Sequence, residues 1–148
     1  MITNILIVCI GNICRSPMAE ALLRRALSKQ PGSQPFQIRS AGIGALVGHP
    51  ADDHALTLMA ERGLDISEHR ASQLNRDMIH WADLILVMET SHKHHIESQY
   101  PTARGKTYRL SEWDQLDIED PYRLSEDAFR KCLSNIEGGV TIWLSKLK

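Results

Sequence analysis

The sequence lacks a surplus of charge of either sign, with 17 Lys and Arg against 18 Asp and Glu and a net charge of -1. Nucleic-acid-binding proteins usually carry a basic excess or a basic face. A long hydrophobic run is also missing, because the apolar stretch over 5–10 is too short for a signal peptide or a membrane span. These absences predict no nucleic-acid partner, no membrane insertion and a cytoplasmic location.

Cysteine is scarce, with three residues in a chain of 148. An odd number of cysteines in a chain too large to need disulfide cross-links favours a reducing compartment and free thiols. The composition, 43% hydrophobic and 24% charged, excludes a disordered or fibrous protein. The length fits one domain with one sizeable core, so residues 1–148 are predicted to form a single domain.

Short apolar runs predict the strands. Residues 5–8 and 84–88 are apolar without alternation, which is typical of strands buried on both faces of a parallel sheet. Residues 36–40 and 107–110 predict two more strands. Strands that alternate with helices predict an α/β fold, here a three-layer domain with a four-stranded parallel sheet and helices on both faces.

Helical spacing and capping residues predict the helices. The first has Ser16 as its N-cap and Pro17 at its first helical position. The last follows Ser125 and contains Gly138 and Gly139 as a weak point. Three more helical segments are predicted. One begins at the N-cap Asp52 and ends at Gly63, and the others cover 75–81 and 90–99. In the segment over 90–99, Ile96 is the only residue expected to pack in a core.

A cysteine stands at the end of the first predicted strand, and an arginine follows after five residues at the mouth of a helix. A loop of that length can direct successive backbone N–H groups at one point, next to the positive end of the helix dipole. Arg15 adds a bidentate clamp for phosphate oxygens, and the same field favours the thiolate form of Cys9. A cysteine after a strand is more often plain packing, but the flanking strand and helix start favour function. The predicted phosphate-binding loop comprises Ile10, Gly11, Asn12, Ile13, Cys14, Arg15 and Ser16.

Two segments carry a family resemblance. Residues 9–17 resemble, residue for residue, the phosphate-binding loop of the low-molecular-weight protein tyrosine phosphatases. Residues 120–122, Asp-Pro-Tyr, resemble the general-acid loop of that family. Residues 40–42 and His69 also match, so the resemblance covers the whole chain and implies that it is a protein-tyrosine-phosphatase, a phosphoric monoester hydrolase.

The resemblance implies a mechanism without cofactor or metal. Cys9 would attack phosphorus to form a cysteinyl-phosphate, while Arg15 binds the equatorial oxygens. Asp120 would protonate the leaving phenolate and then act as the base for the attacking water, with phosphate as the product. Ser16 would hydrogen-bond the Cys9 sulfur.

The family also implies supporting residues around the loop. Asn12 would hold the loop in shape through hydrogen bonds that include Ser40 and His69. Each of the three also has a purely structural interpretation: Asn12 as a residue of a left-handed turn, Ser40 as the end of a strand, and His69 as a surface or core histidine. The sequence departs from the family pattern at Ser72, a position often held by arginine.

A substrate slot is implied next to the loop. Tyr122 would form an aromatic wall, with Ile10 and Leu46 as apolar contacts, in a slot that admits phosphotyrosine and keeps phosphoserine from the nucleophile. Residues 42–48, with Leu46 where eukaryotic members usually carry an aromatic residue, resemble bacterial members associated with exopolysaccharide export. That subgroup implies a bacterial tyrosine autokinase as the phosphotyrosine protein acted on.

The other cysteines and a histidine cluster have alternative readings. Cys14 could form a disulfide with Cys9 under oxidant, or simply pack beneath the loop. Cys132 lies on the apolar face of the last predicted helix, so we expect it to be buried. His92, His94 and His95 are expected on a solvated helix face rather than at a metal site, because no cysteine or carboxylate completes a ligand set.

Two other functions compete with phosphatase activity. A thioredoxin-coupled arsenate reductase shares this kind of loop but needs a further cysteine pair, and residues 64–87 contain no cysteine. A non-catalytic phosphotyrosine-binding module would be expected to lack Cys9 or Asp120, and both are present.

Overall fold

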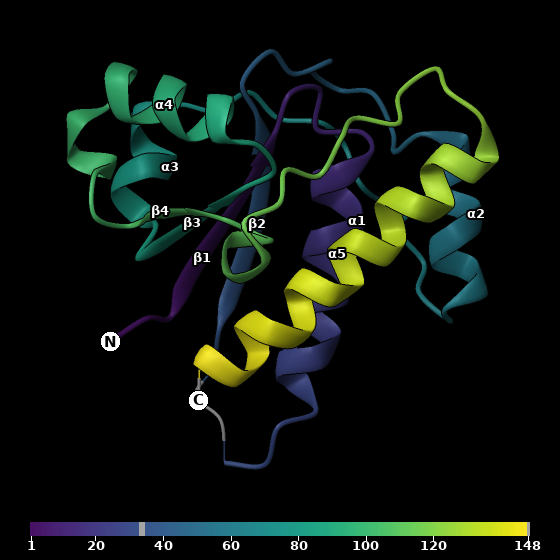
Figure 1. The fold of residues 1–148 in the computed structure, drawn as a ribbon, viewed down its shortest axis with the longest axis horizontal. Helices are drawn as coiled ribbons and strands as arrows, with labels where there is room; N and C mark the ends of the chain where they lie inside the picture. Colours follow the sequence, from purple (N-terminus) through teal and green to yellow (C-terminus); the bar gives the residue numbers. More distant parts are fainter. Residues whose placement is uncertain (33–34, 148) are drawn as a thin grey trace.

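The computed structural model describes residues 1–32 and 35–147 (Figure 1). Four parallel strands form one sheet in the order β2-β1-β3-β4. The strands are β1 (Asn4–Cys9), β2 (Gln37–Gly42), β3 (Leu84–Val87) and β4 (Thr107–Arg109). The predicted fold class is therefore confirmed. The second strand extends two residues further than predicted, because Gly42 still pairs with Cys9 at the end of β1.

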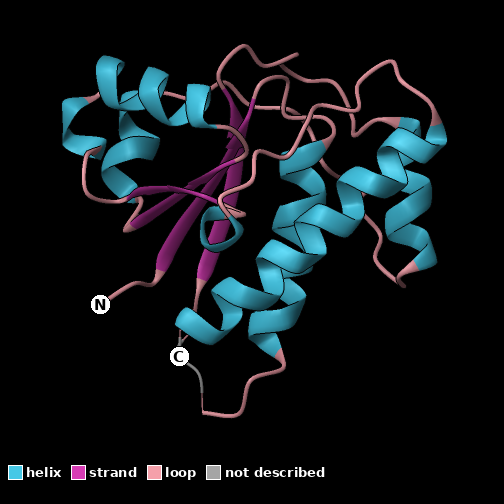
Figure 2. Cartoon of the chain, viewed as in Figure 1, coloured by secondary structure: helices cyan, strands magenta, loops and turns pink. Residues whose placement is uncertain are grey.

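Helices cover both faces of the sheet (Figure 2). One face carries α1 (Arg15–Ser28), α2 (Asp53–Glu61) and α5 (Glu126–Lys146), and the other carries α3 (Arg76–Trp81) and α4 (Thr90–Gln99). Short 3-10 turns occupy Pro101–Ala103 and Glu112–Asp114. None of the described helices is long and apolar enough to cross a membrane.

The alternation of side chains along β1 explains why both faces are covered. Ile5 and Ile7 pack against α1 and α5, whereas Leu6 and Val8 face the smaller core under α3 and α4. All four side chains are fully buried. A strand that is apolar on both faces can be satisfied only inside a three-layer arrangement.

The capping residues predicted for α2 and α5 are confirmed. Asp52 accepts a hydrogen bond from the His54 amide at 2.9 Å, and Ser125 accepts one from the Ala128 amide at 3.3 Å. Gly63 follows α2 with a positive φ of 74°, a conformation that glycine adopts without a steric penalty.

The predicted start of α1 is wrong by two residues. The helix begins at Arg15, and the N-cap position falls on Cys14, which makes no capping hydrogen bond with its side chain. The Ser16 hydroxyl lies instead within 2.9 Å of the Cys9 sulfur. Pro17 has no N–H group, so the first turn has one donor fewer to satisfy without a capping side chain.

The last helix, α5, is continuous from Glu126 to Lys146 and includes the predicted weak point at Gly138 and Gly139. Gly139 lies against the main chain of Leu110, and a Cβ atom placed on it would meet the Leu110 carbonyl oxygen at 2.8 Å. A Cβ atom on the neighbouring Gly138 would meet nothing within 4 Å. Glycine at 139 therefore permits a close approach of α5 to the sheet.

This difference predicts opposite effects for two adjacent substitutions. Gly139→Ala should lower the free energy of unfolding by about 1–3 kcal/mol, because backbone must move to admit the methyl group. Gly138→Ala should raise it by roughly 0.5–1 kcal/mol, since alanine loses less backbone entropy in a helix. Urea denaturation of both variants measures the difference, and equal effects would contradict the close-approach explanation.

Candidate active site

The loop over 10–14 joins β1 to α1 at the carboxyl edge of the sheet, where α/β proteins usually bind ligands. The segment that follows β2 hydrogen-bonds to the carbonyl groups of residues 9–11. The amides of Ile43, Gly44 and Leu46 donate to the carbonyls of residues 9, 10 and 11 at 2.9, 3.0 and 3.1 Å, respectively. The N–H and C=O groups of a trans peptide point in opposite directions. The amides of residues 10–12 are therefore directed to the inner side of the loop, where an anion can bind.

Glycine is required where β2 meets this loop. A Cβ atom on Gly42 would lie 2.4 Å from the Ile10 carbonyl oxygen. No side chain larger than hydrogen fits there without displacing the loop. Residues 40–42, which resemble the family sequence, therefore include a glycine that packs directly against the loop.

Asn12 fixes the shape of the loop. Its φ of 60° is in the left-handed region. Its side-chain amide donates to Ser16 Oγ at 2.7 Å and to Ser40 Oγ at 3.0 Å, and its Oδ1 accepts from the Ser72 amide at 2.9 Å. His69 Nε2 lies 2.7 Å from the Asn12 carbonyl oxygen. The structure therefore brings Ser40 and His69 to Asn12, and Ser72 contributes through its main chain.

The hydrogen bonds around Asn12 lead to the Cys9 sulfur. Ser16 Oγ accepts from Asn12, so its own hydroxyl proton is available to the sulfur 2.9 Å away. The main-chain amide of Asn12 also donates to this sulfur, at 3.3 Å. Ser40, which likewise accepts from Asn12, donates onward to Glu20 Oε1. Two polar groups, the Ser16 hydroxyl and the main-chain amide of Asn12, are thus directed at one sulfur.

Arg15 is 1% exposed, and both of its hydrogen bonds are made through Nη1. Its Nη1 donates to Glu89 Oε2 at 2.6 Å and to the Ile118 carbonyl oxygen at 2.7 Å. Both hydrogens of Nη1 are thus engaged, and among the described residues no hydrogen bond uses Nε or Nη2. The edge formed by Nε and Nη2 matches the bidentate geometry of a phosphate.

The sequence did not single out Glu89 or Ile118. Glu89 follows β3 almost directly, and β3 pairs with β1, which carries the loop. A carboxylate at the end of a neighbouring strand is a signal that could have identified Glu89. The Ile118 contribution comes from a main-chain carbonyl, which no side-chain pattern reveals.

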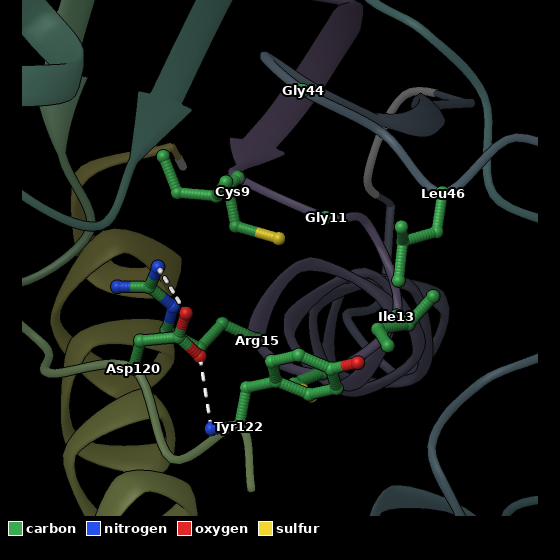
Figure 3. Close-up of a pocket in the computed structure, with 10 residues that line it drawn as sticks. Cys9, Gly11, Ile13, Arg15, Gly44, Leu46, Asp120 and Tyr122 are labelled. Carbon is green, nitrogen blue, oxygen red and sulfur yellow. Dashed lines mark hydrogen bonds and ion pairs between the residues drawn. The ribbon is translucent and has the colours of Figure 1, made fainter.

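Asp120 lies at the mouth of the site (Figure 3). Its Oδ1 accepts from the Tyr122 amide at 3.1 Å, and its Oδ2 is 3.7 Å from Arg15 Nη2. A turn follows, in which the Leu124 amide donates to the Pro121 carbonyl and Arg123 has a positive φ of 65°. In Figure 3 the Tyr122 ring extends toward Ile13, and the Asp120 carboxyl group lies beside the Arg15 guanidinium.

A cavity of about 140 Å³ connects these groups. Cys9 lies at its base, only 2% exposed, whereas the predicted wall residues Ile10, Leu46 and Tyr122 are each more than a third exposed at its rim. Asn12, in the loop, and Ser16, in the first turn of α1, are fully buried and do not line the cavity. The lining residues are Cys9, Ile10, Gly11, Ile13, Cys14, Arg15, Gly44, Leu46, Asp120 and Tyr122.

The two other cysteines are protonated thiols at neutral pH. Burial raises the pKa of the Cys14 thiol far above its ordinary value, and burial raises the pKa of Cys132 to about 12. Cys14 lines the cavity, while Cys132 is buried on α5 as predicted. Neither has the donors that surround the Cys9 sulfur.

One of the three clustered histidines is not on a solvated face, so the prediction for His92 is wrong. His94 and His95 are exposed, but His92 is 3% exposed and its Nε2 lies 3.3 Å from Glu89 Oε2. Its spacing of four residues from the buried Ile96 was the available signal. Over 1–32 and 35–147, no group of three or more His, Cys, Asp or Glu side chains could hold a metal ion.

The chain matches a known family over nearly its whole length. The family model described as "Low molecular weight phosphotyrosine protein phosphatase" matches residues 4–148. A Ralstonia solanacearum protein named as a probable low molecular weight protein-tyrosine-phosphatase, EpsP, is 51% identical over 148 residues, covering 100% of this chain and 98% of that protein.

Solved structures agree with this match. The tyrosine phosphatase Wzb from Escherichia coli K30, in complex with sulphate, is 42% identical, with a TM-score of 0.91 and all of both chains covered. The YwlE arginine phosphatase from Geobacillus stearothermophilus is 36% identical, with a TM-score of 0.88 and 98% and 92% covered. The chain belongs to the low molecular weight protein-tyrosine-phosphatase family of hydrolases.

Proposed function

We propose that this phosphatase hydrolyses phosphotyrosine in proteins through a cysteinyl-phosphate on Cys9, with Asp120 as the general acid. The observation that carries the proposal is that three groups face one cavity: the Cys9 sulfur, the Nε and Nη2 edge of Arg15, and the Asp120 carboxyl group. No metal or cofactor enters the proposed reaction.

In the first step the Cys9 thiolate attacks phosphorus in line with the tyrosyl oxygen. The S–P bond forms as the P–O bond breaks, and protonated Asp120 gives its proton to the leaving phenolate. The equatorial oxygens are held by the loop amides and by Nε and Nη2 of Arg15. Because phosphoryl transfer has a loose transition state, this fixed arrangement of charge supplies most of the stabilisation.

In the second step water attacks the cysteinyl-phosphate. The Asp120 carboxylate accepts a proton from the water, the S–P bond breaks, and phosphate leaves. The hydroxyl of Ser16 and the amide of Asn12, both within hydrogen-bonding distance of the sulfur, stabilise the thiolate that departs. Cys9 and the protonated acid are thereby restored, since Asp120 now carries the proton.

The specificity for phosphotyrosine is proposed to come from depth and apolar walls. The sulfur lies at the base of the cavity and the wall residues Ile10, Leu46 and Tyr122 stand at its rim. A flat aromatic ring can span that depth between apolar side chains, whereas the short phosphoserine side chain cannot bring its phosphorus to the sulfur. The uncharged wall residues also favour a phenyl ring over the guanidinium of phosphoarginine.

The experiment is the initial rate of phosphate release from matched peptides that carry phosphotyrosine, phosphoserine or phosphoarginine. It is run with chelator and without added metal. Rapid release from the phosphotyrosine peptide alone is the expected result. Faster release from phosphoarginine would overturn the substrate assignment, and saturable binding without hydrolysis would favour a non-catalytic binding module.

The proposed physiological substrate is a bacterial tyrosine autokinase that acts in exopolysaccharide production or export. The sequence of residues 42–48, including Leu46 at the rim of the cavity, supports this assignment by resemblance. A cytoplasmic location, where thiols stay reduced, suits a nucleophilic cysteine. Deleting the gene should raise the phosphotyrosine content of that kinase, as measured by mass spectrometry, and unchanged phosphorylation would exclude it as the substrate.

Oxidant should inactivate the enzyme reversibly if Cys14 protects the nucleophile. Peroxide oxidises the Cys9 thiolate to a sulfenic acid, and the Cys14 thiol then displaces water to form a disulfide. Added dithiothreitol should restore activity. In the Cys14→Ser variant, recovery should fall several-fold because Cys9 proceeds to the sulfinic acid, and equal recovery in both proteins would refute protection.

A further inference from the structure

A buried histidine lies behind the phosphate-binding arginine. His92 Nε2 is 3.3 Å from Glu89 Oε2, the same oxygen that accepts from Arg15 Nη1 at 2.6 Å. We propose that His92 is a positioning residue, which holds the Glu89 carboxylate so that Arg15 presents Nε and Nη2 to phosphate. The inference rests on the proposed function of Arg15 and deepens it.

Glu89 needs such a partner because little else in its own helix restrains it. It occupies the N-cap position of α4 but makes no capping hydrogen bond with its side chain. The Thr90 amide at the start of the helix donates instead to Asp117 Oδ1 at 2.9 Å. The Glu89 side chain is 29% exposed and has three rotatable bonds, so it can reach solvent-facing conformations. His92, one helical turn later, approaches it from the protein interior.

The protonation state of His92 follows from its surroundings. Burial and the charge of Arg15 lower the pKa of His92, against the opposing influence of Glu89, Asp117 and Asp120. The ring is therefore neutral at pH 7. A carboxylate can only accept, so a neutral ring can donate to Glu89 Oε2 at 3.3 Å only as the tautomer that carries its proton on Nε2. Nδ1 is then a buried acceptor without a partner among the described residues.

The buried Nδ1 atom of His92 bears on whether this residue positions Glu89 or only fills space in the core. A buried polar atom without a hydrogen bond destabilises the folded state. An apolar side chain of similar size would pack at this site without that penalty. On the proposal, the contact of His92 Nε2 with Glu89, the partner of Arg15, accounts for a histidine at this buried position.

The test compares His92→Leu, which removes the donor, with His92→Gln, whose amide N–H can still reach Glu89. The expected result for His92→Leu is a loss of about 10-fold in kcat/KM for the phosphotyrosine peptide, because a small displacement of Arg15 weakens transition-state binding. Its Kd for orthovanadate should rise by a similar factor. His92→Gln should recover most of both losses, and the exposed His95→Leu on the same helix serves as the control.

Stability is measured on the same proteins. His92→Leu should melt at the same temperature as the parent protein or higher, since the unpartnered Nδ1 has gone. A lower Tm or loss of the folded state would overturn the proposal, because His92 would then be structural. Unchanged kcat/KM and vanadate affinity in a folded His92→Leu would overturn it as well.

A double-mutant cycle with Glu89→Gln tests the route of the effect. If His92 acts through Glu89, His92→Leu should add less than about a 2-fold loss in the Glu89→Gln background. Independent losses that multiply would contradict the proposal. Orthovanadate binding is measured by titration without turnover, so the inference can be judged even if the parent enzyme fails to hydrolyse phosphotyrosine.

Discussion

Replacing Cys9 with serine is expected to reduce phosphotyrosine hydrolysis by at least about 10⁴-fold, because a serine hydroxyl is a far weaker nucleophile than a thiolate. The loop amides and Arg15 are unchanged, so the variant should still bind a phosphotyrosine peptide with nearly the parent affinity. Stopped assays of phosphate release and peptide titration measure the two quantities separately.

The matched control for this experiment is Cys132→Ala. Cys132 is a buried thiol on α5, outside the cavity that contains the Cys9 sulfur. Loss of turnover in Cys9→Ser with retention in Cys132→Ala identifies one thiol as the nucleophile. Substantial phosphate release by Cys9→Ser would disprove the covalent mechanism.

Replacing Asp120 with alanine should slow hydrolysis by roughly 10²–10⁴-fold, the usual contribution of general acid catalysis. The loss should be largest for aryl phosphates whose phenols have a high pKa, since these leaving groups depend most on protonation. Activated nitrophenyl esters should lose much less. The slope of log kcat against leaving-group pKa is the measurement.

The neighbouring Glu119→Ala variant provides the control for Asp120. Glu119 is exposed and does not line the cavity that contains the Cys9 sulfur. Its slope should equal that of the parent enzyme. If Asp120→Ala slowed every leaving group equally, Asp120 would contribute charge or position but would not be the acid.

The sequence was sufficient for the sheet because its strands are buried on both faces. Such strands read as uninterrupted apolar runs, and residues 5–8 and 84–88 do so. The end of β2 was harder to predict, since Ser40 to Gly42 are not a hydrophobic run and pair with β1 only because the ladder continues to Cys9. Local patterns cannot contain that information.

The residues of the loop were also predictable, because they are contiguous and their backbone geometry depends on local spacing. Glu89 and His92 were not, since both lie more than 70 positions after Arg15. Glu89 meets Arg15 only in the folded chain, and His92 contacts Glu89. The start of α1 was misjudged for a related reason. Ser16 has the chemistry of an N-cap, but its hydroxyl is oriented by Asn12 and Cys9.

The segment that leads to Asp120 is attached to the site through main-chain groups of Ile118, and this has an evolutionary consequence. Ile118 is joined to the site by its carbonyl, which binds Arg15, and by its amide, which donates to the Met88 carbonyl at 2.9 Å. Peptide groups do not depend on side-chain identity. Exposed positions beside it, such as Leu116 and Glu119, can therefore drift to suit new protein substrates without altering the geometry of the reaction.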